Sequence, residues 1–212
     1  LNWLAVSVWQ KWKIIEYIAK PATMICLITW FIIQTGLQGV TLWFGIGLIL
    51  SLAGDVLLLL FFEQLVGGLI AFLLAHIAYV VGFISAMGEF PLMWFIVFIV
   101  ILGISWAWLM RRIVAGVRAK GLNRLAIPVQ VYGLVISVML LFAWLTLSMP
   151  GQWEVLPAAM VSLGALLFYV SDILLAWNKF IHLARYGRLL NMAAYHLGQM
   201  ALAVGVVLQF AK

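Results

Sequence analysis

Long uncharged stretches alternate with short charged segments along the whole chain. Six stretches of 17 to 34 residues contain no Asp, Glu, Lys or Arg: 21–54, 64–88, 90–110, 125–153, 155–171 and 189–211. A helix needs roughly 20 apolar residues to cross the hydrocarbon core of a membrane, which is about 30 Å thick. The pattern therefore predicts a polytopic membrane protein.

We expect an all-α transmembrane helix bundle that forms a single domain over residues 1–212. Lys20-Pro21 places a proline at the first turn of the first span, where its missing N–H costs nothing. Leu1–Trp9 is mostly apolar but too short to cross a membrane, so we interpret it as the end of a truncated preceding helix. Seven complete spans are predicted at about 21–37, 41–61, 65–87, 91–110, 126–148, 155–177 and 189–210.

The composition excludes a soluble globular domain and gives the bundle an orientation. The chain is 67% hydrophobic and 8% charged, against about 45–50% and 25% for soluble domains. Alternating spans place 11 of the 12 basic residues on one side, and only Lys212 lies on the other, beside Glu89 and Glu154. Basic loops of membrane proteins face the cytoplasm. We therefore expect basic cytoplasmic loops, a C-terminus outside and no nucleic-acid partner; the compact chain and short loops favour a bacterial cytoplasmic membrane.

Two aspartates are the acidic residues that fall inside the predicted spans. Asp55, in Gly54-Asp55-Val56-Leu57-Leu58, and Asp172, in Ser171-Asp172-Ile173-Leu174-Leu175, each lie seven or eight residues from a charged residue at the basic side. At about 1.5 Å per residue, both are expected about 10–12 Å below that boundary. An intramembrane carboxylate usually faces the bundle interior and marks a function. We predict that the two carboxylates face a common cavity; the alternative is that each ties neighbouring helices together.

Other polar residues are predicted near the same depth. Asn191, Tyr195 and Gln199 recur every four residues and form one stripe on a helix, and His76 and Tyr79 share a helix face. Metal-ligand residue types are present, but they lie singly on separate helices, so their spacing predicts no metal site.

Two lysines lie at the boundary above the aspartates. Lys20 begins the first span, and Lys179 follows Asp172 by seven residues, almost on the same helical face. Either can hold a lipid phosphate just outside a deeper cavity. The alternative is that both are ordinary positive charges of cytoplasmic loops.

Short motifs spread along the chain make it similar to the YhhN-type lysoplasmalogenases. They run in family order from about residue 11 to the end. The motifs are Lys20-Pro21-Ala22-Thr23, Gly54-Asp55-Val56-Leu57-Leu58, Ala75-His76-Ile77-Ala78-Tyr79, Phe168-Tyr169-Val170-Ser171-Asp172, Trp177-Asn178-Lys179-Phe180 and Tyr195-His196-Leu197-Gly198-Gln199. Family members often have a second tyrosine where this chain has His196, so no role is carried over to that residue.

The resemblance implies an eight-helix plan and hydrolysis of the vinyl-ether bond of lysoplasmalogens. This reaction gives a fatty aldehyde and a glycerophospho-base, and it needs no cofactor. Protonation of the β-carbon of a vinyl ether gives an oxocarbenium ion, to which water adds. One carboxylic acid donates the proton and a second carboxylate stabilises the cation or orients the water, as in glycoside hydrolysis.

We therefore assign catalysis to Asp55 and Asp172, without deciding which is the acid. The remaining residues are expected to bind the substrate. His76, Tyr195 and Gln199 are expected to position water or the ether oxygen, Lys20 and Lys179 to hold the phosphate, and Tyr79, Ser171 and Asn178 to complete the substrate site.

Two other classes of function remain open at this point. A proton- or cation-coupled transporter can use the same aspartate pair, and a lipid-binding protein without catalysis is the third reading. The expected partners are a lysophospholipid substrate and membrane lipids, and the sequence predicts no particular oligomeric state.

Overall fold

The computed structural model describes the backbone of residues 2–60, 65–182 and 186–211, and the side chains of residues 19–58, 66–182 and 186–211. Within these residues the chain forms seven α-helices, two short 3-10 helices and no strand. This confirms the expected all-α class. The α-helices are α1 (Asn2–Thr35), α2 (Val40–Leu60), α3 (Leu65–Ser85), α4 (Leu92–Ala119), α5 (Ala126–Leu145), α6 (Val155–Phe180) and α7 (Gly187–Phe210).

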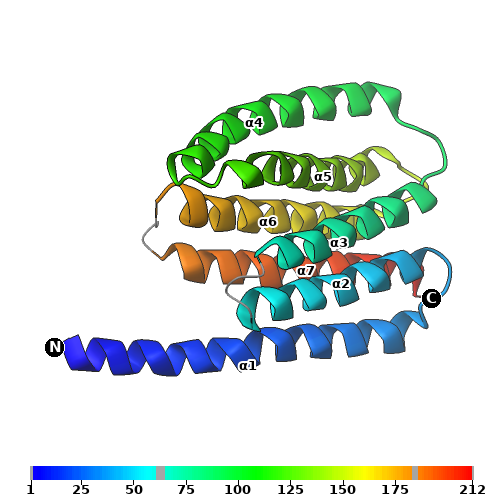
Figure 1. Ribbon diagram of the computed structural model, residues 1–212. Helices are drawn as coiled ribbons and strands as arrows, with labels where there is room; N and C mark the ends of the chain where they lie inside the picture. Colours follow the sequence, from blue (N-terminus) through cyan, green and yellow to red (C-terminus); the bar gives the residue numbers. More distant parts are fainter. Residues whose placement is uncertain (1, 61–64, 183–185, 212) are drawn as a thin grey trace.

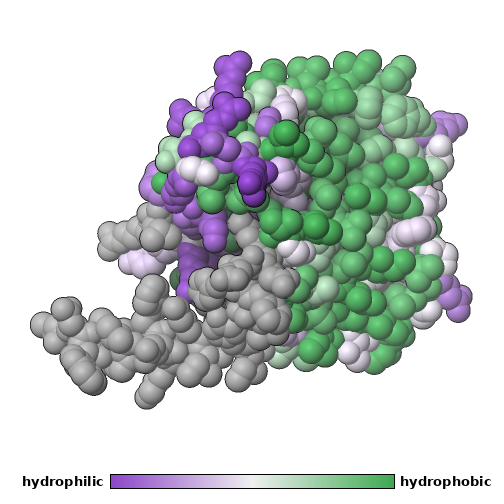
Figure 2. Space-filling model, in the orientation of Figure 1, coloured by the Kyte–Doolittle hydropathy of each residue, from purple (hydrophilic) through white to green (hydrophobic). Residues whose placement is uncertain are grey.

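The helices lie side by side in one bundle, with α1 and α4 at opposite edges (Figure 1). Six of them, α2 to α7, are long and apolar enough to cross a membrane, and Ala19–Thr35 of α1 is apolar but shorter. On the face shown in Figure 2, hydrophobic residues form a broad band and hydrophilic residues gather at its two ends. These features identify a multi-pass membrane protein.

Two helices extend beyond the predicted spans. Pro21 lies inside α1 rather than at its first turn, and Asn2–Trp9 belong to this same helix instead of a separate one. Helix α4 continues past the predicted end at residue 110 to Ala119 and therefore includes Gly116. Charged residues end the apolar segment, but arginine is a good helix former, so the helix itself continues.

Close backbone contact joins α6 to α7 and fixes how these two helices present their polar residues. A Cβ atom added to Gly164 of α6 would lie 2.5 Å from the backbone nitrogen of Leu202 on α7. One added to Gly198 of α7 would lie 2.9 Å from the carbonyl oxygen of Gly164. Small residues allow such approach between membrane helices. The pair therefore sets Asp172 of α6 and Tyr195 of α7 in fixed relative positions.

Aromatic rings of α3 pack over glycines of α2. The ring of Tyr79 covers Gly47, and the ring of Phe72 covers Gly54, where an added Cβ would lie 2.2 Å and 2.6 Å from the respective rings. The sequence Gly54-Asp55 therefore brings an aromatic residue of α3 beside the aspartate of α2.

The two ends of the bundle differ in charge, as the alternating spans predict. The loop after α3 and the loop before α6 meet at one end, where the backbone N–H of Gly88 donates to Oε1 of Gln152 at 2.9 Å. Glu89 and Glu154 lie in these loops. The ends of α4 and α6 meet at the opposite end, where Lys120 contacts Lys179. Arg185, counted on the basic side, lies outside the described residues, as do the side chains of Lys11 and Lys13.

Candidate functional site

Asp55 of α2 lies in a sealed polar cluster between α1, α2 and α7. Its side chain is fully buried, and Lys20 Nζ of α1 lies 2.6 Å from its Oδ1. The hydroxyl of Tyr195 donates to Asp55 Oδ2 at 2.6 Å. The Lys20 ammonium also lies 4.8 Å from the centre of the Tyr195 ring. The carboxylate is thereby neutralised and hydrogen-bonded, as a buried charge requires.

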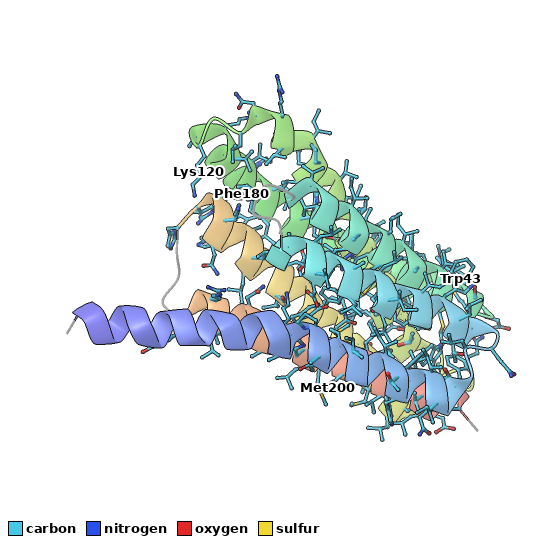
Figure 3. The ribbon with its side chains drawn as sticks, turned by 60° about the horizontal axis from the view of Figure 1, so that its bottom comes forward. Trp43, Lys120, Phe180 and Met200 are labelled. Atoms are coloured by element: carbon cyan, nitrogen blue, oxygen red, sulfur yellow. The ribbon has the colours of Figure 1, made fainter. Side chains whose placement is uncertain are left out.

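This pairing gives Lys20 a partner other than the expected phosphate. Only 14% of its side chain is exposed, and its ammonium contacts Asp55. Figure 3, turned so that α1 comes forward, shows this helix lying against α7. Because α1 continues through Pro21, Lys20 lies within a helix that packs against the bundle. It does not lie at the start of a helix, as the sequence had predicted. Phosphate binding by Lys20 stays a prediction, and the ion pair competes with it.

Asp172 of α6 lies in a second polar cluster, with residues of α3 and α5. The hydroxyl of Tyr132 on α5 donates to Asp172 Oδ2. Nε2 of His76, on α3, lies 3.8 Å from the same oxygen. The imidazole is fully buried, and its ring centre is 4.7 Å from that of Phe168 and 5.5 Å from that of Tyr132. Three helices thus converge on one carboxyl group.

An apolar cavity of about 200 Å³ opens beside Asp172. Residues of α3, α4, α5 and α6 form most of its wall, and nearly all of them are aliphatic or aromatic. Its polar groups come from four side chains: Tyr132, Tyr169, Asp172 and Lys179. A cavity of this kind is suited to a hydrocarbon chain that carries one reactive polar group.

The two aspartates do not share this cavity, contrary to the prediction. Asp172 lines it, whereas Asp55 does not. The ring of Phe168 lies between the clusters, because its centre is 4.7 Å from His76 and 5.3 Å from Tyr195. Of the two carboxyl groups, that of Asp172 is the one that reaches this cavity.

A third polar group lies between α2, α3 and α7. The hydroxyl of Tyr79 donates to Oε1 of Gln199 at 2.8 Å, and Tyr79, Gln199 and Ser51 are all fully buried. The amide nitrogen of Gln199 and the hydroxyl of Ser51 have no hydrogen-bond partner among the described residues. The predicted polar stripe of α7 thus faces the interior at Tyr195 and Gln199. Buried polar atoms of this kind are usually satisfied by ordered water.

Three other predicted residues lie along α6. Ser171 donates from its hydroxyl to the carbonyl oxygen of Asn191 at 3.1 Å, and the Asn191 amide donates to the Ser171 carbonyl at 2.6 Å. These bonds join α6 to α7. Asn178 packs against Gly187 at the start of α7, and Lys179 is exposed at the rim of the cavity. Of the three, Lys179 is the one that lines the cavity.

Tyr132 is the site residue that the sequence analysis missed. It lies within a long uncharged span and belongs to none of the motifs that carry the resemblance. The sequence feature that could have identified it is a tyrosine within an apolar span, because a buried tyrosine hydroxyl usually has a polar partner. His196, half-buried on α7, packs its ring against Tyr195 at 5.0 Å between ring centres. Among the described residues, no three His, Cys, Asp or Glu side chains gather as metal ligands would.

This arrangement can transfer a proton inside an apolar cavity. A carboxyl group at the wall can donate a proton to a bound substrate, and the Tyr132 hydroxyl holds that group in one orientation. Both imidazole nitrogens of His76 are buried without a hydrogen-bond partner in the described part of the chain. A water molecule bridging His76 Nε2 and Asp172 would satisfy the nitrogen that faces the carboxyl group.

Comparison with known proteins gives the family. The model of the YhhN family matches residues 15–206. Lysoplasmalogenase TMEM86B of Rattus norvegicus is 31% identical over 83 residues, which cover 39% of this chain and 31% of the relative. The protein of the same name from Mus musculus is 32% identical over 83 residues, covering 39% of this chain and 32% of the relative.

These matches span about a third of the length of the curated relatives. No solved structure matches the chain significantly. The family model, by contrast, covers nearly the whole chain, in agreement with the resemblance carried by its motifs. The chain belongs to the YhhN family.

Proposed function

We propose that the protein hydrolyses the vinyl-ether bond of a lysoplasmalogen or a related single-chain lipid, and that Asp172 is the proton donor. The observation that carries the proposal is a carboxyl group at the wall of an apolar cavity inside a membrane bundle. The names of the two relatives, both lysoplasmalogenases, support the choice of substrate. The hydrocarbon chain lies in the cavity, with the vinyl ether beside Asp172.

The reaction consumes one water molecule and needs no redox partner. The Asp172 carboxyl group donates its proton to the β-carbon of the vinyl ether, and the electron pair on the ether oxygen forms an oxocarbenium ion. Water adds to the cationic carbon and returns a proton to the Asp172 carboxylate. The resulting hemiacetal then breaks its bond between the carbon and the glycerol oxygen while its hydroxyl proton passes to that oxygen, releasing the fatty aldehyde and the glycerol hydroxyl. This use of a carboxyl group follows the chemistry of glycoside hydrolysis.

Other residues of the site support this step. Tyr132 orients the carboxyl group, and His76, 3.8 Å from Asp172 Oδ2, positions the attacking water. Asp55, paired with Lys20 and bonded by Tyr195, acts from behind the Phe168 ring as a positioning residue.

A linkage panel tests this proposal. Purified protein is incubated with three lysolipids that share one chain and headgroup and differ only in a vinyl-ether, alkyl-ether or ester linkage. We expect fatty aldehyde from the vinyl ether alone, because protonation at carbon requires its double bond. Release of fatty acid from the ester, or no product from any of the three, would contradict the proposal.

The transporter remains the alternative from another class. Two intramembrane carboxylates, one of them ion-paired, are the observation that favours it. Solute uptake into protein-loaded vesicles without aldehyde formation would support transport over hydrolysis. Lysolipid binding with neither activity would support a lipid-binding protein.

A further inference from the structure

A basic groove lies at the end of the bundle where α4 and α6 meet. It has a volume of about 600 Å³, and it is lined by Arg112, Lys120 and His182 together with small residues of α4 and the last turn of α6. Figure 3 shows Lys120 and Phe180 close together at this end, far from Trp43 at the other. None of the described residues that line the groove is acidic.

Close packing of α4 on the end of α6 builds this groove. A Cβ atom added to Gly116 would lie 2.5 Å from the carbonyl oxygen of Phe180, so α4 touches α6 there without a side chain between them. Nζ of Lys120 donates to the carbonyl oxygen of Lys179 at 2.6 Å. The guanidinium of Arg112 lies 4.5 Å from the centre of the Trp108 ring. Both cations are thus held in place by the protein while they stand exposed to the groove.

The groove adjoins the apolar cavity of the candidate site. Phe180 lines both hollows, and Lys179, whose carbonyl holds Lys120, lines the cavity. Asp172 lies eight residues before Phe180 on α6, which corresponds to about 12 Å along the helix axis. Arg112 itself lies one residue before Ile113 on α4, which lines the cavity. The two hollows are therefore neighbours, and one elongated molecule with a polar backbone could occupy both.

We propose that this groove binds the phosphate of a single-chain phospholipid whose hydrocarbon chain occupies the apolar cavity, with Arg112 and Lys120 as its ligands. Guanidinium and ammonium groups form charge-assisted hydrogen bonds to phosphate oxygens. A cavity of about 200 Å³ is small beside usual ligand pockets of about 300–1,000 Å³, which favours one chain over two. This assignment rests on the proposed function for the position of the chain, and it places the phosphate near Lys179 but away from Lys20.

Binding of a lipid that cannot be hydrolysed tests the groove. The probe is a single-chain alkyl-ether phosphocholine, and the comparison ligand is the alkylglycerol with the same chain and no phosphate, both added to the purified protein in nanodiscs. For Arg112→Gln we expect about tenfold weaker binding of the phospholipid, as for loss of one charged hydrogen bond. Binding of the alkylglycerol stays unchanged. Arg112→Lys keeps the positive charge and restores part of the affinity.

The matched control is Arg118→Gln, because Arg118 is an exposed arginine on the same stretch of α4 that does not line the groove. The assignment would be overturned if Arg118→Gln lost as much affinity for the phospholipid as Arg112→Gln does. It would also be overturned if Arg112→Gln lost equal affinity for the alkylglycerol, or lost no affinity for the phospholipid. Lys120→Gln is a second variant, and its thermal unfolding is measured alongside because Lys120 also holds the end of α6.

A further arm separates a lipid phosphate from a free one. Glycerol 3-phosphate and inorganic phosphate are added as competitors of the phospholipid. We expect neither to displace it at millimolar concentration; displacement that disappears in Arg112→Gln would show a site for free phosphate compounds and overturn the lipid assignment. Binding is measured without turnover, so the two proposals can fail separately. Arg112-dependent binding by a protein that releases no aldehyde would contradict the proposed hydrolysis and support the phosphate site. Aldehyde release by a protein whose lipid binding does not depend on Arg112 would support hydrolysis and contradict the phosphate site.

Discussion

Two side chains of opposite charge, Lys20 and Asp55, are held 2.6 Å apart in the interior of the bundle. Such a pair is not strongly stabilising in itself, but removal of one partner leaves the other charge buried and uncompensated. Lys20 joins α1 to the bundle through this contact and through the Tyr195 ring. We therefore expect the main role of the ion pair to be in the stability of the folded bundle.

Lys20→Met tests this interpretation. The substitution leaves Asp55 charged and fully buried without its cation, and we expect it to lower the free energy of unfolding by about 3 kcal/mol. The double variant Lys20→Met with Asp55→Asn removes both charges, and it is expected to be more stable than Lys20→Met alone. Thermal unfolding in detergent measures both.

The matched control for this pair is Lys179→Met, which removes a lysine at the cavity rim that is exposed. It is expected to change the unfolding temperature little. Two results would show that the Lys20–Asp55 contact does not stabilise the protein specifically: a double variant whose loss of stability is the sum of the two single losses, or a Lys179→Met variant that loses as much stability as Lys20→Met.

Tyr132→Phe tests the orientation of Asp172. Loss of the phenol hydroxyl removes the hydrogen bond to Asp172 Oδ2 and keeps the ring that packs against His76. We expect aldehyde release to fall about tenfold, as for the loss of one hydrogen bond to the carboxylate that forms when Asp172 gives up its proton. Tyr169→Phe is the control, because Tyr169 lines the same cavity without bonding Asp172 in the described structure. An equal fall in both variants would assign the effect to the cavity and not to the hydrogen bond.

The sequence predicts the acidic residues of the site better than their partners. Asp55 and Asp172 can be identified because a charged residue within an apolar span is energetically costly and usually has a function. The Lys20–Asp55 pair depends on the rotation of α1 against α2 and on a helix that continues through Pro21, and no pattern along the chain gives that rotation. The closed position of Asp55 depends on Phe168, an aromatic residue like many others in the spans.

At the scale of helices, glycine contacts decide which polar faces meet. Gly164 and Gly198 bring the backbones of α6 and α7 together, and the two helices carry Asp172 and Tyr195. A shift of either helix would move its polar residue relative to the cavity.

Gly164→Ala is expected to destabilise the protein. The added Cβ would lie 2.5 Å from the backbone nitrogen of Leu202, so the helices must separate, at a cost of about 2 kcal/mol. Gly103→Ala on α4 is the control, because a Cβ added at Gly103 has nothing within 4 Å and alanine is the better helix former. Unfolding in detergent should show loss of stability for the first and none for the second; equal stability of the two variants would contradict the close contact.

The hydrophobic pattern predicts the existence and order of the helices but not where α1 and α4 end. The absence of charge marks the part of a helix that lies in the membrane, and α4 extends past it through Arg111 and Arg112 to Ala119. A glycine is needed at position 116 of that extension because the backbone there contacts the carbonyl oxygen of Phe180. That contact joins residues far apart in the chain, so a single sequence could not reveal it.

At the scale of the whole molecule, charge separates the two ends of the bundle. The loops that carry Glu89 and Glu154 meet at one end, and the ends of α4 and α6 form the basic end. The positive-inside rule predicts that the basic end faces the cytoplasm. The proposed phosphate groove then opens to the inner leaflet.

Cysteine labelling tests this orientation. Glu89→Cys and Arg124→Cys are made in a Cys26→Ser background, and intact cells are treated with a membrane-impermeant maleimide. We expect Glu89→Cys to be labelled directly and Arg124→Cys only after the cells are permeabilised. The opposite pattern would invert the bundle and place the groove at the outer leaflet.

Aldehyde release by wild-type protein and by Asp172→Asn from the same vinyl-ether lysolipid tests the central claim most directly. Asparagine keeps the shape of the side chain but cannot donate the acidic proton, so we predict that release falls at least about 100-fold. Binding of the alkyl-ether lipid and thermal unfolding should stay close to those of the wild type. Wild-type rates of aldehyde release in a correctly folded Asp172→Asn protein would contradict the account.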